Sequence, residues 1–189
     1  MKTGKCILMA LLWLGLCNAS FAAEAAPVGR ALIYIDPQEY THEIKLWHFY
    51  YDYWFSQCRA VEPVALDALK PLFAETAMCK GNNAADILIW IKPGMFYNPH
   101  MTTFYGKIVA KVYSGSGKPV ATYKANVQHG GYLDVLPKEQ VKAAYQAAMQ
   151  KIVGRMQADR ALQALIARGL PESETRMPCS MVAVLPAAK

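Results

Sequence analysis

The chain has 189 residues and a formal net charge of +6, from 20 Lys or Arg and 14 Asp or Glu side chains. This length suits one domain with its own hydrophobic core. The charge excess is mild and is not gathered into a cluster of Lys and Arg, so it excludes the basic footprint of a nucleic-acid-binding protein.

The first 22 residues have the three-part layout of a secretory signal. A basic start at 1–5 precedes the apolar run 6–16, and small side chains at Ser20 and Ala22 stand at the spacing that a signal peptidase recognises. The apolar run is shorter than the roughly 20 residues that span a bilayer. We therefore expect residues 1–22 to be cleaved, leaving a periplasmic or secreted protein without a transmembrane segment.

Three cysteines follow the signal: Cys58, Cys79 and Cys179. In an oxidising compartment this number predicts one disulfide and one remaining thiol. A helix expected between Cys58 and Cys79 would be about 22 Å long, whereas disulfide-bonded Cα atoms lie roughly 6 Å apart. Cys179 can reach either partner from the tail, so the pairing among the three stays open.

The mature chain starts with small residues at 23–30, which we interpret as a flexible leader. An apolar, partly β-branched run at 31–35 predicts a first strand. The segment 38–58 is aromatic without a clear period, so helix and strand both stay open. A helical pattern over 63–77 follows, and Pro71 is expected to kink or shorten it.

The central part of the chain predicts three strands. Residues 85–91 are apolar without alternation, which is typical of a strand covered on both faces, and Pro93-Gly94 is expected to break or bulge it. Alternating patterns at 102–113 and 120–127 are separated by the turn sequence Ser114–Gly117. These two segments predict a hairpin.

The C-terminal part predicts a long helix. Pro137 opens an apolar stripe that runs to Ile166 and slips near Asp159, where a bend or a second helix is expected. We expect one α+β domain over 31–170, with a single largely antiparallel or mixed sheet of about four strands backed by helices. Residues 171–189 are expected to form an irregular tail.

Aromatic side chains are more abundant at 47–55 and 94–101 than two surface segments need. Tyr and Trp combine a large apolar area with a polar tip, which suits them to interfaces and to stacking on sugars. The alternative is that they complete a small core. The candidate binding residues are Trp47, Tyr50, Tyr53, Trp54, Phe96 and Tyr97.

Soft metal ligands form a second, weaker candidate site. His100, Met101, Cys179 and Met181 offer the imidazole, thioether and thiolate groups that copper(I) favours, although Met also fills cores. A Cys nucleophile with His129 as its base is a further alternative. We predict no cofactor and no catalytic residue.

From Ala85 onward, about 80 residues resemble the small α/β domains of bacterial envelope-assembly and transport accessory proteins. The amino-terminal domain of the Tol-system propeller protein and the curli-secretion lipoprotein are of this type. The resemblance lies in the strand at 85–89, the hairpin segment at 106–112 with its turn at 115–117, and the helix at 141–166. It implies an accessory role in the envelope and no shared active site.

The sequence thus favours a non-enzymatic periplasmic accessory protein that binds an envelope protein or a cell-surface polymer through aromatic surfaces. The alternatives are a copper-handling protein, an inhibitor or immunity protein for an exported enzyme, and an enzyme with a Cys–His pair. The sequence does not determine the oligomeric state.

Overall fold

The computed structural model describes residues 28–81, 83–168, 177–179, 182 and 185. The expected signal at 1–22 lies outside the described residues. So do most of the expected leader and most of the tail. Among the described residues, no helix combines the length and the apolarity needed to cross a bilayer.

A five-stranded mixed sheet forms the centre of the fold, in the order β4-β1-β6-β7-β8. The strands β4, β1 and β6 are parallel, and β6, β7 and β8 are antiparallel. The structure therefore confirms an α+β fold with a mixed sheet, with five strands where about four were expected. The strands are β1 (Arg30–Ile35), β4 (Glu75–Met78), β6 (Ile87–Asn98), β7 (Thr103–Ser114) and β8 (Pro119–Gly130).

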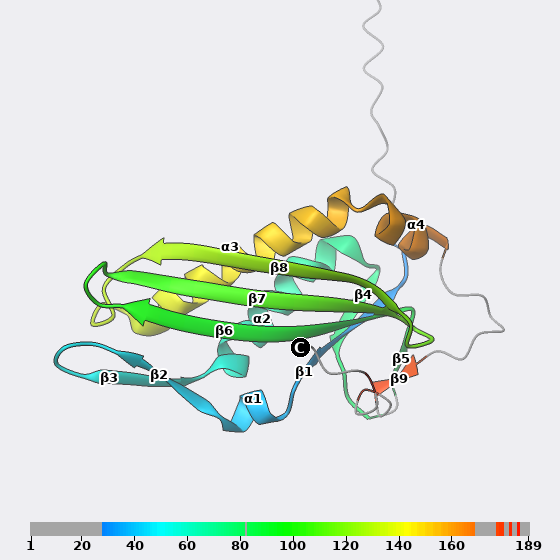
Figure 1. Ribbon diagram of the computed structural model, residues 1–189. Coiled ribbons are helices and arrows are strands. Elements are labelled where there is room, and N and C mark those ends of the chain that lie inside the picture. The colour runs from blue at the N-terminus through cyan, green and yellow to red at the C-terminus, as the bar shows by residue number, and fades with distance from the viewer. Residues whose placement is uncertain (1–27, 82, 169–176, 180–181, 183–184, 186–189) are drawn as a thin grey trace, which may run out of the picture.

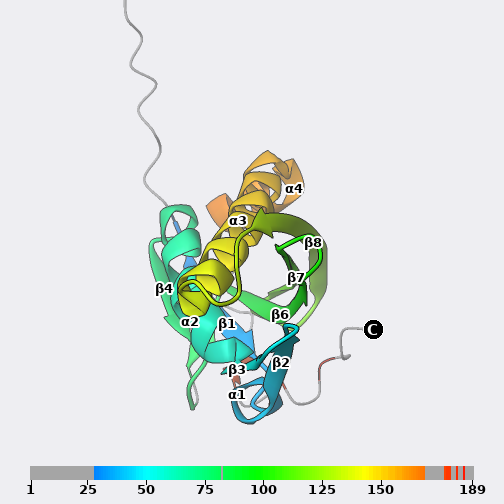
Figure 2. The ribbon, with the colours of Figure 1, turned by 90° about the vertical axis from the view of Figure 1, so that its left-hand side faces the viewer.

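Helices cover one face of this sheet (Figure 1). α2 (Gln57–Leu69) and α3 (Pro137–Ala158) pack side by side, and the three long strands curve around one side of α3 (Figure 2). α4 (Arg160–Arg168) continues beyond α3. The smaller elements are α1 (Gln38–Thr41), the 3-10 turn η1 (Lys70–Leu72), the hairpin β2 (Glu43–Trp47) and β3 (Asp52–Ser56), and the pair β5 (Ala84–Ala85) and β9 (Met177–Pro178).

Along the long strands, every second side chain faces the helices and contributes to the main core. Phe104, Ile108 and Ala110 of β7 are fully buried against the helices, as the period-2 pattern predicted. The α3 stripe meets them with Ala144 and Ile152, which are also fully buried. The predicted change of direction falls at Asp159, whose carboxylate accepts the N–H groups of the first turn of α4 and so caps it.

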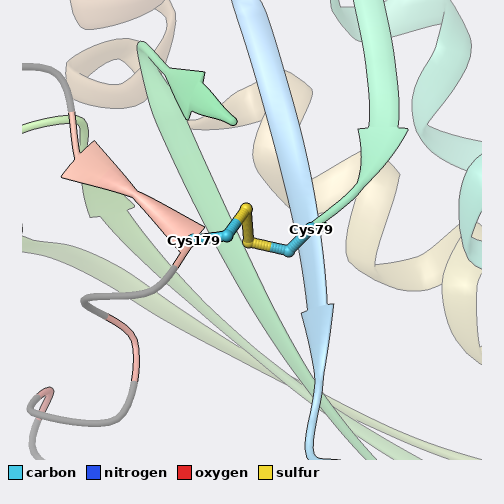
Figure 3. Close-up of a disulfide and its surroundings, with 2 residues drawn as sticks. All are labelled: Cys79 and Cys179. Atoms are coloured by element: carbon cyan, nitrogen blue, oxygen red, sulfur yellow. A yellow bond between two sulfur atoms is a disulfide. The ribbon is translucent and has the colours of Figure 1, made fainter. Parts of the chain in front are cut away.

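The opposite face of the sheet has a smaller core that the tail covers. Leu32 of β1 and Leu88 of β6 pack there with Val182, so the unalternating run at the start of β6 is covered on both faces, as predicted. A disulfide joins Cys79, just after β4, to Cys179, just after β9 (Figure 3). This settles the open pairing and ties the tail to the sheet.

The helix expected over 63–77 is wrong at both ends. α2 begins at Gln57 and contains Pro63, and it ends at Leu69. Lys70, before Pro71, still has helical dihedral angles, but Pro71 has no N–H to continue the hydrogen bonds of the α-helix, so the chain passes into η1 there. Residues 75–78 then form β4, paired in parallel with β1.

The break expected at Pro93-Gly94 does not occur, because β6 runs on to Asn98. The strand pairs with β1 only as far as Ile91, and with β7 along its whole length. From Lys92 onward one side of β6 therefore has no neighbouring strand of this sheet. Pro93 has no N–H to donate, and at a sheet edge that lack is tolerated.

The free edge of β8 is covered by cations from α3. The Lys151 Nζ donates a hydrogen bond to the Asn126 carbonyl oxygen at 3.4 Å, and Arg155 donates to the Lys124 carbonyl oxygen. Such cover protects an edge strand against pairing with another chain.

Candidate functional site

The aromatic segment, left open as helix or strand, is the hairpin β2–β3. Its inner side chains, such as Leu46, pack on the main core. The tip is the four-residue connection 48–51, closed by a hydrogen bond from the His48 N–H to the Tyr51 carbonyl oxygen. Turns favour Gly, Asn, Asp, Pro and Ser, whereas this tip consists of His and aromatic residues. The geometry of the turn therefore does not explain these side chains.

The hairpin tip lies against the turn between β6 and β7. The rings of Phe49 and His100 are 4.9 Å apart, edge to face, and the rings of His48 and Tyr97 are 6.5 Å apart. The two segments that the sequence singled out as aromatic are thus in contact.

A third segment, residues 131–136 before α3, joins the same end of the molecule. The Tyr97 hydroxyl donates to the Gly131 carbonyl oxygen and accepts from the Leu133 N–H, both at 3.3 Å. Leu133 is fully buried, while Tyr132 and Leu136 are 61% and 68% exposed. Leu133 therefore anchors this loop in the core, while Tyr132 and Leu136 stay on the surface.

These three segments carry nearly all the large apolar side chains that the described residues expose. Ten such residues are exposed, and nine of them lie on the hairpin, near the β6–β7 turn or in the loop before α3. In Figure 1 the three segments meet at the same end of the molecule. We call these nine residues the aromatic end: Trp47, Phe49, Tyr50, Trp54, Phe96, Met101, Tyr132, Val135 and Leu136.

Backbone strain is found in two of these three segments. Among the described non-glycine residues, only Thr102 and Leu136 have positive φ, at 45° and 49°. Left-handed geometry costs an ordinary residue roughly 1–2 kcal/mol. Strain of this kind gathers at functional loops, and Leu136 keeps a mostly exposed side chain at its strained position.

Two buried polar atoms of the hairpin tip itself have no hydrogen-bond partner, His48 Nδ1 and the Tyr51 hydroxyl. Burial, followed by the nearby charge of Asp134, raises the pKa of Tyr51. Buried polar atoms without partners are uncommon in folded proteins. The tip is therefore held by its one backbone hydrogen bond and by ring packing, while these two side-chain atoms have unused hydrogen-bonding capacity.

The six predicted binding residues have different locations. Tyr50 is 91% exposed, and Trp47, Trp54 and Phe96 are about half exposed. Tyr97 is 1% exposed, so its place on a binding surface was wrong: its hydroxyl is used inside to hold the loop at 131–136.

Tyr53 lies on the inner side of the hairpin, partly buried and stacked on Phe55 with ring centroids 5.8 Å apart. Both rings line a hollow of about 410 Å³ between β3 and the starts of α2 and α3. Arg59, Lys138 and Lys142 also line it, together with Glu139, so the lining of the hollow has a net positive charge.

Sequence reasoning missed the loop at 131–136 as part of the surface. The available signal was an apolar group, Tyr132, Val135 and Leu136, between the end of a strand and the start of a helix. Connections between elements are usually polar, so such a group indicates either burial or contact with a partner. Only the structure shows that Leu133 is buried while its neighbours are not.

The copper-ligand candidates do not form one group in the structure. His100 and Met101 follow the end of β6, whereas Cys179 lies beside its start, bonded to Cys79. Twelve strand residues separate these ends, or about 36 Å. Met181 lies outside the described residues, among which no group of three His, Cys, Asp or Glu side chains could hold a metal.

The cysteines are poorly suited to nucleophilic attack. Cys58 is fully buried, and burial, reinforced by nearby Glu39 and Glu62, raises its pKa to about 12. A thiol is reactive as the thiolate, so this environment suppresses its reactivity. The ring of His129 is in contact with Gln140, Nε2 to Oε1 at 2.8 Å.

No family model and no curated protein matches this chain. Among solved structures, the fold is similar to the crystal structure of protein XCC0632 from Xanthomonas campestris, described under the family model DUF330. The TM-score is 0.46 and the sequence identity 13%, over 75% of this chain and 90% of that chain.

Proposed function

We propose that this chain is a non-enzymatic accessory protein of the bacterial envelope that binds a partner protein through the aromatic end. The observation that carries the proposal is the concentration of exposed apolar side chains: nine of ten lie on three segments that meet at one end. An exposed apolar patch of this kind is typical of an interaction site.

The composition of the aromatic end supports a protein partner. Trp, Tyr, Phe and Met are enriched in the centres of protein interfaces, and Trp and Tyr dominate their binding energy. Tyr50 at the hairpin tip is 91% exposed, so folding of this chain alone does not require an aromatic ring there. A cell-surface polymer that stacks on the same rings is the alternative partner.

Export is part of the proposal and has two supports. The first 22 residues have the layout of a cleavable signal, and Cys79 and Cys179 form a disulfide, which is typical of oxidising compartments. The proposed address is the periplasm or the exterior. The resemblance to Tol-system and curli-secretion domains stays a prediction in line with this role.

Site-specific photo-cross-linking in the intact envelope tests the proposal. Benzoylphenylalanine is placed at position 50, where Tyr50 is 91% exposed, and at position 118, where the exposed Lys118 lies at the β7–β8 turn. We expect one protein adduct from position 50 and none from position 118. Equal adducts at both positions, or adducts at neither, would contradict a partner at the aromatic end.

Two equally exposed valines test whether binding depends on the aromatic end or on any exposed apolar side chain. Val135, in the aromatic end, and Val28, outside it, are each 51% exposed. We expect Val135→Ser to weaken the position-50 adduct several-fold, because an apolar contact is lost at the interface. Val28→Ser should leave the adduct unchanged. An equal effect of both substitutions would show that the surface is not specific.

A further inference from the structure

The outer face of β6, β7 and β8 is basic, and these three strands contribute no acid to it. These strands, at 87–98, 103–114 and 119–130, hold four lysines and neither Asp nor Glu. Because side chains alternate between faces, the strand register places all four lysines on the face away from the helices. In Figure 1 this face is turned to the viewer, with α2 and α3 behind it. The lysines are Lys92, Lys107, Lys111 and Lys124.

A hollow of about 440 Å³ lies on this face, at a position where Gly94 provides no side chain to fill it. Gly94 pairs with Lys107, which pairs in turn with Asn126. These three residues form one row of paired positions across the three strands. Since Gly94 has no side chain, the β6 end of this row is unfilled. A Cβ at position 94 would meet only the Lys107 Cβ, at 3.7 Å, and the Lys107 carbonyl oxygen, at 4.0 Å, so the hollow is open space above an unstrained backbone.

Aromatic rings form one wall of this hollow. In the next row, Phe96 pairs with Tyr105, and Tyr105 pairs with Gln128. The two rings are 5.8 Å apart with an interplanar angle of 43°. The Tyr105 hydroxyl lies 3.5 Å from the Met101 sulfur, to which it donates. The wall therefore has a ring surface that is fixed in orientation and more than half exposed at Phe96.

We propose that this hollow binds an acidic polysaccharide, with the polymer lying across the three strands. The Lys107 ammonium group attracts a carboxylate, and the rings of Phe96 and Tyr105 stack on the apolar face of a sugar ring. The amides of Asn126 and Gln128 can donate to and accept from sugar hydroxyls. This site goes beyond the proposed protein contact and shares only Phe96 with the aromatic end.

Charge and shape together favour this ligand. Lys92 and Lys124 occupy the row next to Lys107, about 6.6 Å away along the strands. Each of the three strands thus carries one of these lysines, and a negatively charged polymer that crosses the strands passes a cation on each of them. A face without acids attracts such a polymer at long range. The amides of Asn126 and Gln128 can hydrogen bond to sugar hydroxyls beside the aromatic rings. An acidic polypeptide offers carboxylates but no sugar hydroxyls or sugar rings, so we expect it to fit this hollow less well.

Binding of three polymers to the chain lacking residues 1–22 tests the inference. The probes are polygalacturonate, neutral dextran, and poly-glutamate of matched charge, measured by titration calorimetry. We expect polygalacturonate to bind, with affinity that falls as salt is raised, and the other two to bind at least about tenfold more weakly. No binding of polygalacturonate, or equal binding of poly-glutamate, would overturn the proposal.

Two substitutions locate the site. Gly94→Leu fills the hollow and should weaken polygalacturonate binding about tenfold, and Lys107→Gln should weaken it about fivefold. The matched control Lys118→Gln removes an exposed lysine at the far end of the same strands and should change binding less than about twofold. If Gly94→Leu binds like the parent, the hollow is not the site. Trp47→Ala should leave polygalacturonate binding intact even where it abolishes the protein adduct, which keeps the two proposals distinguishable.

Discussion

At the scale of single residues, two tyrosines of the predicted binding set show why residue type alone does not place a side chain. Tyr50 is 91% exposed, whereas Tyr97 is 1% exposed and hydrogen bonded to the loop before α3 through its hydroxyl. Both stand in aromatic-rich stretches. The difference lies in strand position, because Tyr97 faces inward on β6 and Tyr50 stands at a hairpin tip.

Tyr97→Phe should therefore lower the free energy of unfolding by about 1–2 kcal/mol, since the buried Leu133 N–H loses its partner. Tyr50→Phe removes the same hydroxyl from an exposed ring and should change it by less than about 0.5 kcal/mol. Urea unfolding followed by tryptophan fluorescence measures both. Equal effects would mean that the Tyr97 hydroxyl contributes no net stability.

Cys58 gives a second prediction at this scale. With its pKa raised to about 12, only about one thiol in ten thousand is ionised at pH 8. The folded chain lacking residues 1–22 should not react with Ellman's reagent over an hour, and one thiol per chain should react once guanidinium unfolds it. Rapid reaction of the folded protein would restore the Cys–His hypothesis.

At the scale of secondary-structure elements, the contact of α3 with the sheet depends on Gly106 of β7. A Cβ there would lie 3.1 Å from the Ala144 carbonyl oxygen of α3 and 3.1 Å from a methyl group of Val127. The helix backbone approaches the strand through this gap. A larger side chain would have to move α3, which is a rigid neighbour.

Gly106→Val should accordingly destabilise the protein by about 2–3 kcal/mol. The matched control is Gly94→Val, in the neighbouring row of the same hairpin, where a Cβ makes only ordinary contact. That substitution should change the free energy of unfolding by no more than about 0.5 kcal/mol. If both substitutions lower the free energy of unfolding equally, glycine is needed in these strands for backbone freedom, and the close approach of α3 to Gly106 is not the reason.

The elements that depend on local patterns were the ones the sequence predicted well. The β7–β8 hairpin follows from alternation and a Gly-containing turn, and the bend at Asp159 follows from a slip of the apolar stripe. The helix at 63–77 failed because Pro63 sits inside a helix that is stabilised by packing on α3. Likewise, residues 75–78 became a strand because β1 offered an edge for pairing.

At the scale of the whole molecule, the disulfide between Cys79 and Cys179 links residues 100 positions apart. It fixes the tail beside the second core, where Val182 packs on Leu32 and Leu88. A link that closes so long a loop restricts the unfolded chain strongly, and a native disulfide typically stabilises by about 2–4 kcal/mol.

Reduction with a phosphine should therefore lower the free energy of unfolding by about 2–4 kcal/mol and make the tail accessible to protease. Cys58→Ala, which keeps the disulfide, is the control: reduction should cost this variant the same amount as the parent. If reduction changes neither stability nor cleavage, the bridge does not hold the tail in place.

Short stretches of the sequence were enough to predict an export signal, an α+β fold with helices on a sheet that was either largely antiparallel or mixed, and a surplus of aromatic rings. The folded structure was needed to show which rings face outward, which cysteines pair, and that the hairpin tip, the β6–β7 turn and the loop 131–136 meet at one end. The physical reason is that alternation and capping act over a few residues, whereas exposure depends on what distant segments cover. In this protein Val182 of the tail packs with Leu32 and Leu88 on one part of the outer sheet face, whereas the lysines of that face at 92, 107 and 124 are exposed.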